Sequence, residues 1–264
     1  MHEKKSNIYI EKTKKIKQNK ISKRGLKKIN IRKICLLILL MIFGIFLKLN
    51  NKKIKIGVVG LKHHKNIGNN LLKFAISTKL KELGVQPYII GIHGFRGVKQ
   101  SISFINRTTN LRIVKDFKEI KKTDYDILMV NSDQTWRNLG YFFYDIAFLK
   151  FAENWTIPKF VYGASIALEK WNFTEKTNKI AKKLLKNFTG ISVREISTVN
   201  LVKKNLGFDA LFVLDPTLLI DKNYYINIVK KYKNTEINIK ENFILTYKMY
   251  YKDKLNSFIN KAKR

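Results

Sequence analysis

Short apolar runs alternate with helical stretches from residue 53 onward, and this alternation most constrains the fold. Helices are predicted between several of the runs, notably at 70–83, 174–187 and 197–206. Strands that are apolar on both faces and alternate with helices form parallel sheets that helices cover on both sides. The sequence therefore predicts an α/β protein with a Rossmann-like parallel sheet. The predicted strands are residues 54–59, 87–92, 111–114, 126–130, 159–162, 190–193 and 211–214.

The helix at 70–83 has a clear apolar face and a clear end. Leu72, Ile76, Leu80 and Leu83 recur at helical spacing, and Gly84 follows them. Glycine directly after the last apolar position is the usual helix terminator, because it adopts positive φ without a steric penalty.

The net charge of +34 does not by itself indicate nucleic-acid binding. The lysines are spread along the whole chain, and no helix carries the aromatic and basic stripe with which proteins bind single strands. No nucleic-acid partner is therefore predicted. The single cysteine, Cys35, excludes a disulfide framework and a paired-thiol motif, and no metal site is predicted.

The N-terminal 49 residues form two segments. Residues 1–33 are strongly basic and lack a hydrophobic period, which indicates an extended basic arm. Residues 34–47 are continuously apolar and are flanked by basic residues, so we expect a hydrophobic membrane-anchor helix at 34–49. Fourteen residues of helix span about 21 Å, less than the roughly 30 Å of a bilayer core. A buried globular helix is the alternative.

The expected localisation is at the membrane, with one N-terminal hydrophobic segment. A signal peptide is disfavoured because the basic region is too long and no small-residue cleavage site follows Leu47. Basic residues on the N-terminal side favour a cytoplasmic N-terminus. A cytosolic substrate would instead favour a segment lying in the cytoplasmic interface. We expect the folded domain at the cytoplasmic face, and the orientation stays open.

The C-terminal residues look like the opening of another domain. A polar linker at 234–241 separates residues 53–233, the predicted Rossmann-like domain, from a strand at 242–248 and a helix that reaches Arg264. One strand and one helix cannot bury a core of their own. We therefore interpret residues 242–264 as the start of a truncated second domain.

Polar side chains follow four successive predicted strands. In an open parallel sheet, ligands bind outside the carboxyl ends of the strands, so these side chains are expected to form one rim. Helix capping or structural ion pairing could explain each of them singly, but not easily all of them together. The rim residues are Ser132, Asp133, Gln134, Trp136, Ser165, Arg194, Glu195 and Asp215.

The turn after the first strand adds three residues to the predicted rim. Asn66, Gly68 and Asn69 stand just before a helix, where backbone N–H groups bind anions and glycine permits close approach. The turn lacks the three-glycine dinucleotide spacing and the Walker lysine. A simple capping turn is therefore an equally good interpretation.

Four segments of this rim carry a family resemblance. The stretches "NSDQTW", "YGASIA", "ISVRE" and "VLDPTLL", in this order, resemble the signature of the polysaccharide pyruvyl transferase family. The "NIGNN" turn also fits that family's first loop. The resemblance covers residues 53–247. Asn131 departs from the family, which often has glycine there, and the histidine-bearing and basic motifs of the family's second half are missing.

The resemblance implies an architecture and a reaction. Its fold would be the first half of a GT-B-like two-domain architecture, with the active site between the halves. Its reaction would transfer pyruvate as a ketal from phosphoenolpyruvate to a sugar of a cell-surface polysaccharide. The partners would be that donor and a polysaccharide or lipid-linked glycan acceptor, together with a membrane bound through residues 34–49. No cofactor is implied.

The resemblance also suggests catalytic roles for Arg194 and Asp133. Arg194 would hold the phosphate and carboxylate of the donor, because guanidinium binds both groups bidentately. Asp133 would orient acceptor hydroxyls or act as the base. The other rim residues, with Asn66, Gly68 and Asn69, would bind substrate.

Two further hypotheses belong to different classes. One is a truncated relative that binds glycan or a partner chain without catalysis, as the missing second half suggests. The other is a glycosyltransferase that uses a nucleotide sugar, which would share the fold but not these motifs.

Overall fold

The computed structural model describes residues 8–12, 53–60, 67–92, 99–131, 134–137, 143–232 and 243–247. The chain divides into two compact units, residues 30–224 and residues 1–29 with 225–264. The predicted anchor at 34–49, the predicted linker at 234–241 and the predicted C-terminal helix lie outside the described residues. Within the described part, no helix is long and apolar enough to cross a membrane.

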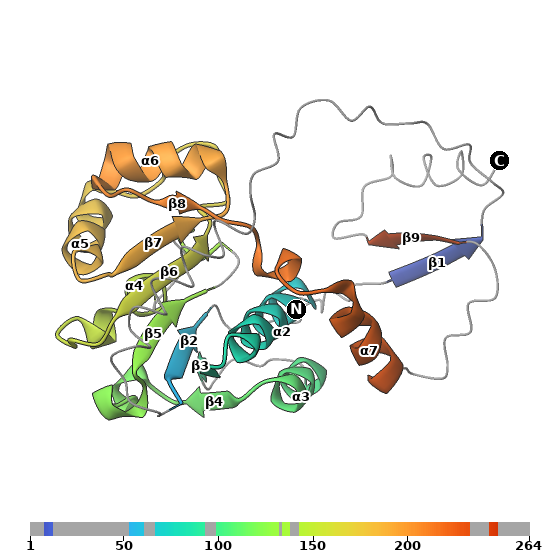
Figure 1. Cartoon of the computed structure of the whole chain (residues 1–264). Helices are drawn as coiled ribbons and strands as arrows, with labels where there is room; N and C mark the ends of the chain where they lie inside the picture. Colours follow the sequence, from blue (N-terminus) through green and yellow to red (C-terminus); the bar gives the residue numbers. More distant parts are fainter. Residues whose placement is uncertain are drawn as a thin grey trace, which may run out of the picture. The chain divides into compact units, whose positions relative to one another are not determined.

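The larger unit is built around a seven-stranded parallel sheet (Figure 1). The strand order is β4-β3-β2-β5-β6-β7-β8. All six strand pairs are parallel, which confirms the predicted α/β class. The strands are β2 (Lys55–Val59), β3 (Gln86–Ile92), β4 (Leu111–Val114), β5 (Ile127–Val130), β6 (Lys159–Ala164), β7 (Gly190–Val193) and β8 (Leu211–Phe212).

Helices cover both faces of this sheet (Figure 1). On one face, α4 (Phe143–Phe148), α5 (Glu175–Leu185) and α6 (Ile196–Leu206) contribute to the larger buried cluster. On the other face, α2 (Ile67–Glu82) and α3 (Lys99–Thr108) contribute Ile76, Leu80 and Ile105 to a second cluster. The inner strands β2, β5, β6 and β7 are buried from both sides, which explains their nearly continuous apolar sequences. The edge strands β4 and β8 are partly exposed.

Helix ends follow local rules that the sequence displays. Gly84 after α2 has φ of 79° and Gly207 after α6 has φ of 82°. Glycine adopts this left-handed conformation readily, so both helices end where glycine occurs. At the start of α5, the Thr174 side chain accepts a hydrogen bond from the backbone N–H of Thr177. The expected termination of the first helix at Gly84 is confirmed.

A bulge interrupts β6 near its end. The pairing with β7 shifts between Val161 and Ala164, and Gly163 has φ of 61°. The Gly163 N–H donates to Ser192 Oγ (3.1 Å), and Ser192 Oγ–H donates to the Val161 carbonyl (2.9 Å). The serine side chain thus replaces the ladder bonds that the bulge removes. Only glycine fits this backbone easily.

The smaller unit contains β1 (Ile8–Lys12), which pairs antiparallel with β9 (Phe243–Tyr247). A strand near residues 242–248 was predicted, whereas none was predicted among residues 1–33. Helix α7 (Lys222–Tyr232) spans the boundary between the two units. The larger unit also contains four short helices, η1 (Phe117–Glu119), η2 (Lys122–Asp124), η3 (Lys150–Ala152) and η4 (Pro216–Leu218).

Gly57→Ala is expected to destabilise the sheet centre. A Cβ at Gly57 would lie 2.9 Å from side-chain carbons of Leu128 and Tyr125 and 3.0 Å from one of Ile90. Overpacking of this kind costs about 1–3 kcal/mol of unfolding free energy, which urea denaturation would measure. The exposed Lys53→Ala on the same segment is the control. Equal stability of the two variants would contradict this packing.

Candidate functional site

The order of the strands places a topological switch point between β2 and β5. From β2 the chain proceeds through β3 to β4 on one side, and then through β5 to β8 on the other. Ligands in doubly wound folds bind at the carboxyl edge of such a point. The backbone N–H of Asn131, the first residue after β5, donates to the Val59 carbonyl at 2.9 Å and ties the two strand ends together.

Backbone hydrogen bonds join the four motif segments beyond the strands. The Trp136 N–H donates to the Ser165 carbonyl at 3.0 Å, so the turn after β5 is fixed to the end of β6. The Arg194 N–H donates to the Ala164 carbonyl at 3.2 Å, and the Val213 N–H to the Val193 carbonyl at 2.9 Å. The segments that sequence analysis grouped as one rim are therefore contiguous in the described structure.

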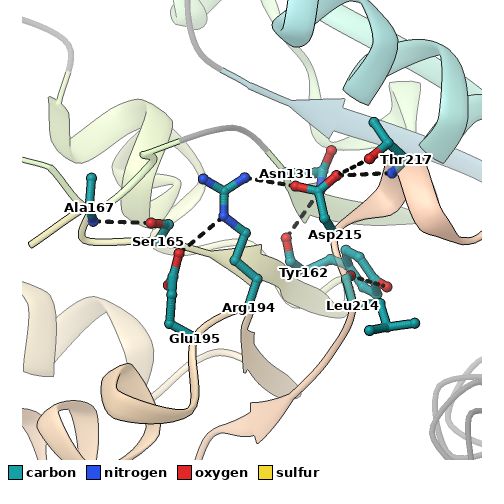
Figure 2. Close-up of polar contacts among 9 residues, drawn as sticks. All are labelled: Asn131, Tyr162, Ser165, Ala167, Arg194, Glu195, Leu214, Asp215 and Thr217. Carbon is teal, nitrogen blue, oxygen red and sulfur yellow. Dashed lines mark hydrogen bonds and ion pairs between the residues drawn. The ribbon is translucent and has the colours of Figure 1, made fainter. Parts of the chain in front are cut away.

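Arg194 is the centre of an ionic cluster at the ends of β7 and β8 (Figure 2). Its Nη1 lies 2.8 Å from Asp215 Oδ2, and its Nε lies 3.2 Å from Glu195 Oε1. The exposed fraction of the side chain is 20% for Arg194, 26% for Asp215 and 37% for Glu195. Water therefore reaches the cluster, while the protein covers most of Arg194 and Asp215. The predicted neighbours Arg194, Glu195 and Asp215 are thus brought together.

Each carboxylate in the cluster also has a local structural bond. Asp215 Oδ1 accepts from the Thr217 N–H at 3.0 Å and from Thr217 Oγ1 at 2.7 Å, which caps η4 (Figure 2). Glu195 Oε2 lies 3.3 Å from Thr198 Oγ1 in the first turn of α6. The helix-capping interpretation therefore holds for Asp215, in addition to its pairing with the guanidinium. Glu195 is the N-cap residue of α6, but its side chain accepts no hydrogen bond from the helix backbone.

Among the described residues, two carboxylates, Asp215 and Glu195, flank the guanidinium of Arg194. This matters for the predicted role of Arg194 as a holder of anions. Two of its N–H groups already bind carboxylates, so a donor anion must approach another edge or displace one acid. Carboxylates that line a partly open edge are also good acceptors for sugar hydroxyls.

Tyr162 connects the end of β5 to this cluster, which sequence analysis did not anticipate. The Asn131 Nδ2 donates to the Tyr162 carbonyl at 3.1 Å, and the Tyr162 hydroxyl donates to the Leu214 carbonyl at 3.0 Å (Figure 2). Leu214 directly precedes Asp215, so the buried tyrosine sets the position of that acid. The sequence feature that could have indicated this role is the tyrosine of the "YGAS" motif.

Two non-glycine residues with left-handed backbone lie after neighbouring strands. Gln134 has φ of 48° and Ala167 has φ of 55°. Ala167 is held by its N–H, which donates to Ser165 Oγ at 3.0 Å (Figure 2). Such conformations persist only when surrounding contacts fix them, and they cluster at functional sites.

Trp136 and Ser165 are buried rather than open to a ligand. Trp136 is 0% exposed, its Nε1–H donates to the Ala147 carbonyl at 3.3 Å, and its ring lies 5.8 Å from that of Phe148. Ser165 is 1% exposed. In this structure both hold the strand ends in place. The side-chain oxygen Oε1 of Gln134 accepts a hydrogen bond from Arg137 Nη1 at 3.0 Å.

The remaining predicted residues divide into described and undescribed positions. Asn66, Ser132 and Asp133 lie outside the described residues. Gly68 is exposed near the start of α2, whereas Asn69 is 7% exposed. In the parts of the chain that the structure describes, no group of His, Cys, Asp and Glu side chains is placed to hold a metal ion.

Lys73 on α2 is a charged residue that sequence analysis did not select. It is 5% exposed, and burial lowers its pKa from 10.5 to about 8. Desolvation disfavours the charged form, so the protonated amine destabilises the folded state unless other groups compensate. Asn70 on the same helix is also buried, at 6% exposure.

The fold and the rim define a doubly wound α/β protein with a polar carboxyl edge. The family model described as polysaccharide pyruvyl transferase matches residues 66–262. The match covers well over half of the chain, and the chain therefore belongs to the polysaccharide pyruvyl transferase family. This confirms the resemblance found in the sequence motifs.

Other comparisons add little. A search of curated proteins found no match. Among solved structures, the chain is similar to the MAR1 ribonuclease from Caenorhabditis elegans at 7% identity and a TM-score of 0.31, over 74% of this chain and 99% of that one. Similarity this low bears on neither fold nor function.

Tyr162→Phe is expected to weaken the fold while leaving the ring packing intact. The change removes the donor to the Leu214 carbonyl, which costs about 0.5–1.5 kcal/mol of unfolding free energy. Tyr144→Phe is the control, because Thr177 keeps its 3.0 Å contact with Thr174 Oγ1 after the Tyr144 hydroxyl is lost. Urea denaturation that shows a larger loss for Tyr144→Phe would contradict the assigned role.

Stability is expected to rise with pH between about 8 and 10.5 through Lys73. The pKa of about 8 in the folded state is below the ordinary lysine value of 10.5, so the unfolded chain binds more protons in this window. Unfolding therefore becomes less favourable as pH rises. Between pH 7.5 and 9.5 the gain is about 1–2 kcal/mol. Urea midpoints measured across this pH range for the natural chain and for Lys73→Met isolate the contribution of Lys73, because the other lysines are common to both proteins. An equal rise in both proteins would refute the assignment.

Proposed function

We propose that this protein transfers the pyruvyl group of phosphoenolpyruvate to a sugar of a cell-surface polysaccharide and forms a ketal. The observation that carries the proposal is the family match over residues 66–262, which includes all four strand-end motifs. The contiguous carboxyl edge supports it, because that edge is the ligand-binding position of the fold.

The reaction needs two sugar hydroxyls and one donor molecule. Both hydroxyl oxygens bond to the enol carbon of the donor, and the bond from that carbon to the phosphate oxygen breaks. One hydroxyl proton passes to the methylene carbon, which becomes a methyl group, and the other leaves with phosphate. Positive charge must therefore stabilise the donor, and a base must accept hydroxyl protons.

Arg194 and Asp133 are the residues that we propose for these tasks. Arg194 supplies a guanidinium whose position is fixed by two carboxylates, 2.8 Å and 3.2 Å away. A charge held in place before the substrate binds costs little reorganisation. Asp133 follows the same strand end as Asn131 and is proposed as the base or as the group that orients hydroxyls. Glu195 and Asp215 are proposed to accept hydrogen bonds from the acceptor sugar.

The two-domain architecture remains part of the proposal. We propose that the described sheet is the first half of a GT-B-like arrangement in which the acceptor lies against the carboxyl edge. A crystal structure of the full chain with phosphoenolpyruvate would test it, since donor bound at the amino edge of the sheet would rule it out.

The decisive experiment follows phosphate release by the full chain from phosphoenolpyruvate in the presence of polysaccharide. Ketal formation is read from the new methyl signal in the NMR spectrum. Arg194→Ala is expected to lower kcat/KM about 10- to 100-fold, the value of a hydrogen bond to a charged group. Arg107→Ala, an exposed arginine at the end of α3, is the control and should retain activity.

A glycan-binding protein without catalysis is the second candidate. The two described carboxylates beside Arg194 favour it, because a guanidinium flanked by carboxylates attracts a donor anion less strongly. The same assay separates the two functions. Polysaccharide binding without any acceptor-dependent phosphate release would reject the transferase and support the binding protein.

A further inference from the structure

Three asparagine side chains hold buried oxygens that lack a hydrogen-bond donor. Asn69, Asn70 and Asn131 are 7%, 6% and 3% exposed, and the side-chain oxygen of each finds no partner in the described structure. Buried polar atoms are nearly always bonded, so each exception needs an explanation. Because an amide oxygen accepts and cannot donate, the group that is missing at these positions is a donor.

The orientation of the Asn131 amide is fixed. Its Nδ2 donates to the Tyr162 carbonyl at 3.1 Å, and a carbonyl oxygen can only accept. Rotation of the amide would break this bond and set two oxygens against each other, so the unpartnered atom is the oxygen. Asn131 directly follows Val130, which pairs with Val59 of β2. This oxygen therefore lies at the switch point of the sheet, where doubly wound folds bind ligands.

Asn69 lies over the same end of the sheet. Helix α2 leads into β3 at the amino edge, and its 16 residues span about 24 Å, so its first turn lies at the carboxyl edge. Asn69, Ile76 and Leu80 recur at helical spacing and share one face of α2. Ile76 and Leu80 pack in one cluster with residues of β2 and β5. The Asn69 side chain is therefore on the face of α2 that is turned toward the sheet.

Asn70 is on a different side of the same helix. It shares a face with Phe74, one turn further along α2. The Phe74 ring packs edge-on against that of Phe104 in α3, with the ring centres 6.2 Å apart. Asn70 therefore lies on the side of α2 that is turned toward α3. It matches Asn69 in residue type and burial but not in direction, which makes it a suitable control.

The segment after β8 borders the corner between β5 and α2. The Tyr162 hydroxyl donates to the Leu214 carbonyl at 3.0 Å, and η4, which begins two residues later, packs against α2 (Figure 2). The hydroxyls described here are already used, since that of Tyr162 donates to Leu214 and that of Thr217 donates to Asp215. The corner thus offers unmet acceptors. A ligand that carries several donors fits them, whereas an anion does not.

We propose that Asn131 and Asn69 form a subsite for the acceptor sugar, in which their side-chain oxygens accept hydrogen bonds from its hydroxyls. The proposal rests on the proposed function and deepens it, since it assigns the acceptor to the corner between β5 and α2 and leaves Arg194 to the donor. A hydroxyl also accepts hydrogen bonds, so it suits the Asn69 amide in either orientation. Both oxygens are buried in the free protein, so the sugar must part α2 slightly from the end of β5 as it enters.

The test measures binding of cell-surface polysaccharide, purified from the organism that makes this chain, to the full chain by calorimetry. Asn69→Leu is expected to raise the dissociation constant about 3- to 10-fold, the loss of one hydrogen bond. The control Asn70→Leu should change it less than twofold. Asn69→Asp should keep most of the affinity, because a carboxylate also accepts from a hydroxyl. Affinity for phosphoenolpyruvate should be the same in all three variants.

Stability separates ligand binding from a structural role. Urea denaturation of Asn69→Leu should show no loss of unfolding free energy, because the oxygen that is removed has no partner in the described structure. Asn131→Ala should lose both affinity and stability, since it also removes the bond to the Tyr162 carbonyl. Reduced stability of Asn69→Leu with unchanged polysaccharide affinity would identify a structural amide and overturn the subsite.

The outcomes separate this inference from the proposed function. If polysaccharide-dependent phosphate release by Asn69→Leu has the same KM as in the natural chain, the subsite is refuted while the transferase proposal stands. If the natural chain binds polysaccharide through Asn69 but releases no phosphate, the subsite stands and the transferase proposal fails. Absence of any polysaccharide binding by the natural chain would overturn the subsite. Should Asn69→Leu not fold, Asn69→Ala replaces it, and unchanged affinity in that variant would be equally decisive against the subsite.

Discussion

The register of strands β5, β6, β7 and β8 is the constraint on which the rest of the structure depends. Backbone bonds beyond the strands link Trp136 to Ser165, Arg194 to Ala164, and Val213 to Val193. A slip of one residue in any strand would move every following side chain to the opposite face. The ionic cluster can form only because these bonds bring the ends of β7 and β8 level.

The fold was largely predictable because its signals are local and strong. Apolar runs bounded by turn residues marked every strand of the sheet, and Gly84 marked the end of α2. The departures have physical causes. β6 runs two residues further than predicted because the Gly163 bulge and Ser192 continue its pairing. β1 was missed because its partner, β9, lies more than two hundred residues away along the chain.

The candidate site was predictable as a set of residues but not as a set of contacts. Motif order placed Arg194, Glu195 and Asp215 on one edge, and they meet there. Spacing alone could not show that the carboxylates bind the guanidinium, nor that Trp136 is fully buried. Asn131, Tyr162 and Lys73 escaped selection because an amide, a phenol and an amine look ordinary until their burial and partners are known.

The bulge at Gly163 has a consequence for how the chain reaches this edge. Tyr162 belongs to the apolar cluster on the α2 face, whereas Val161 and Ala164 both belong to the cluster on the other face. An unbroken strand would have turned Ala164 toward α2. The bulge therefore inverts the facing of Ala164, the last residue of β6. Ala164 therefore packs into the larger cluster at 1% exposure, and the core itself fixes the path by which the chain leaves β6 for the ligand edge.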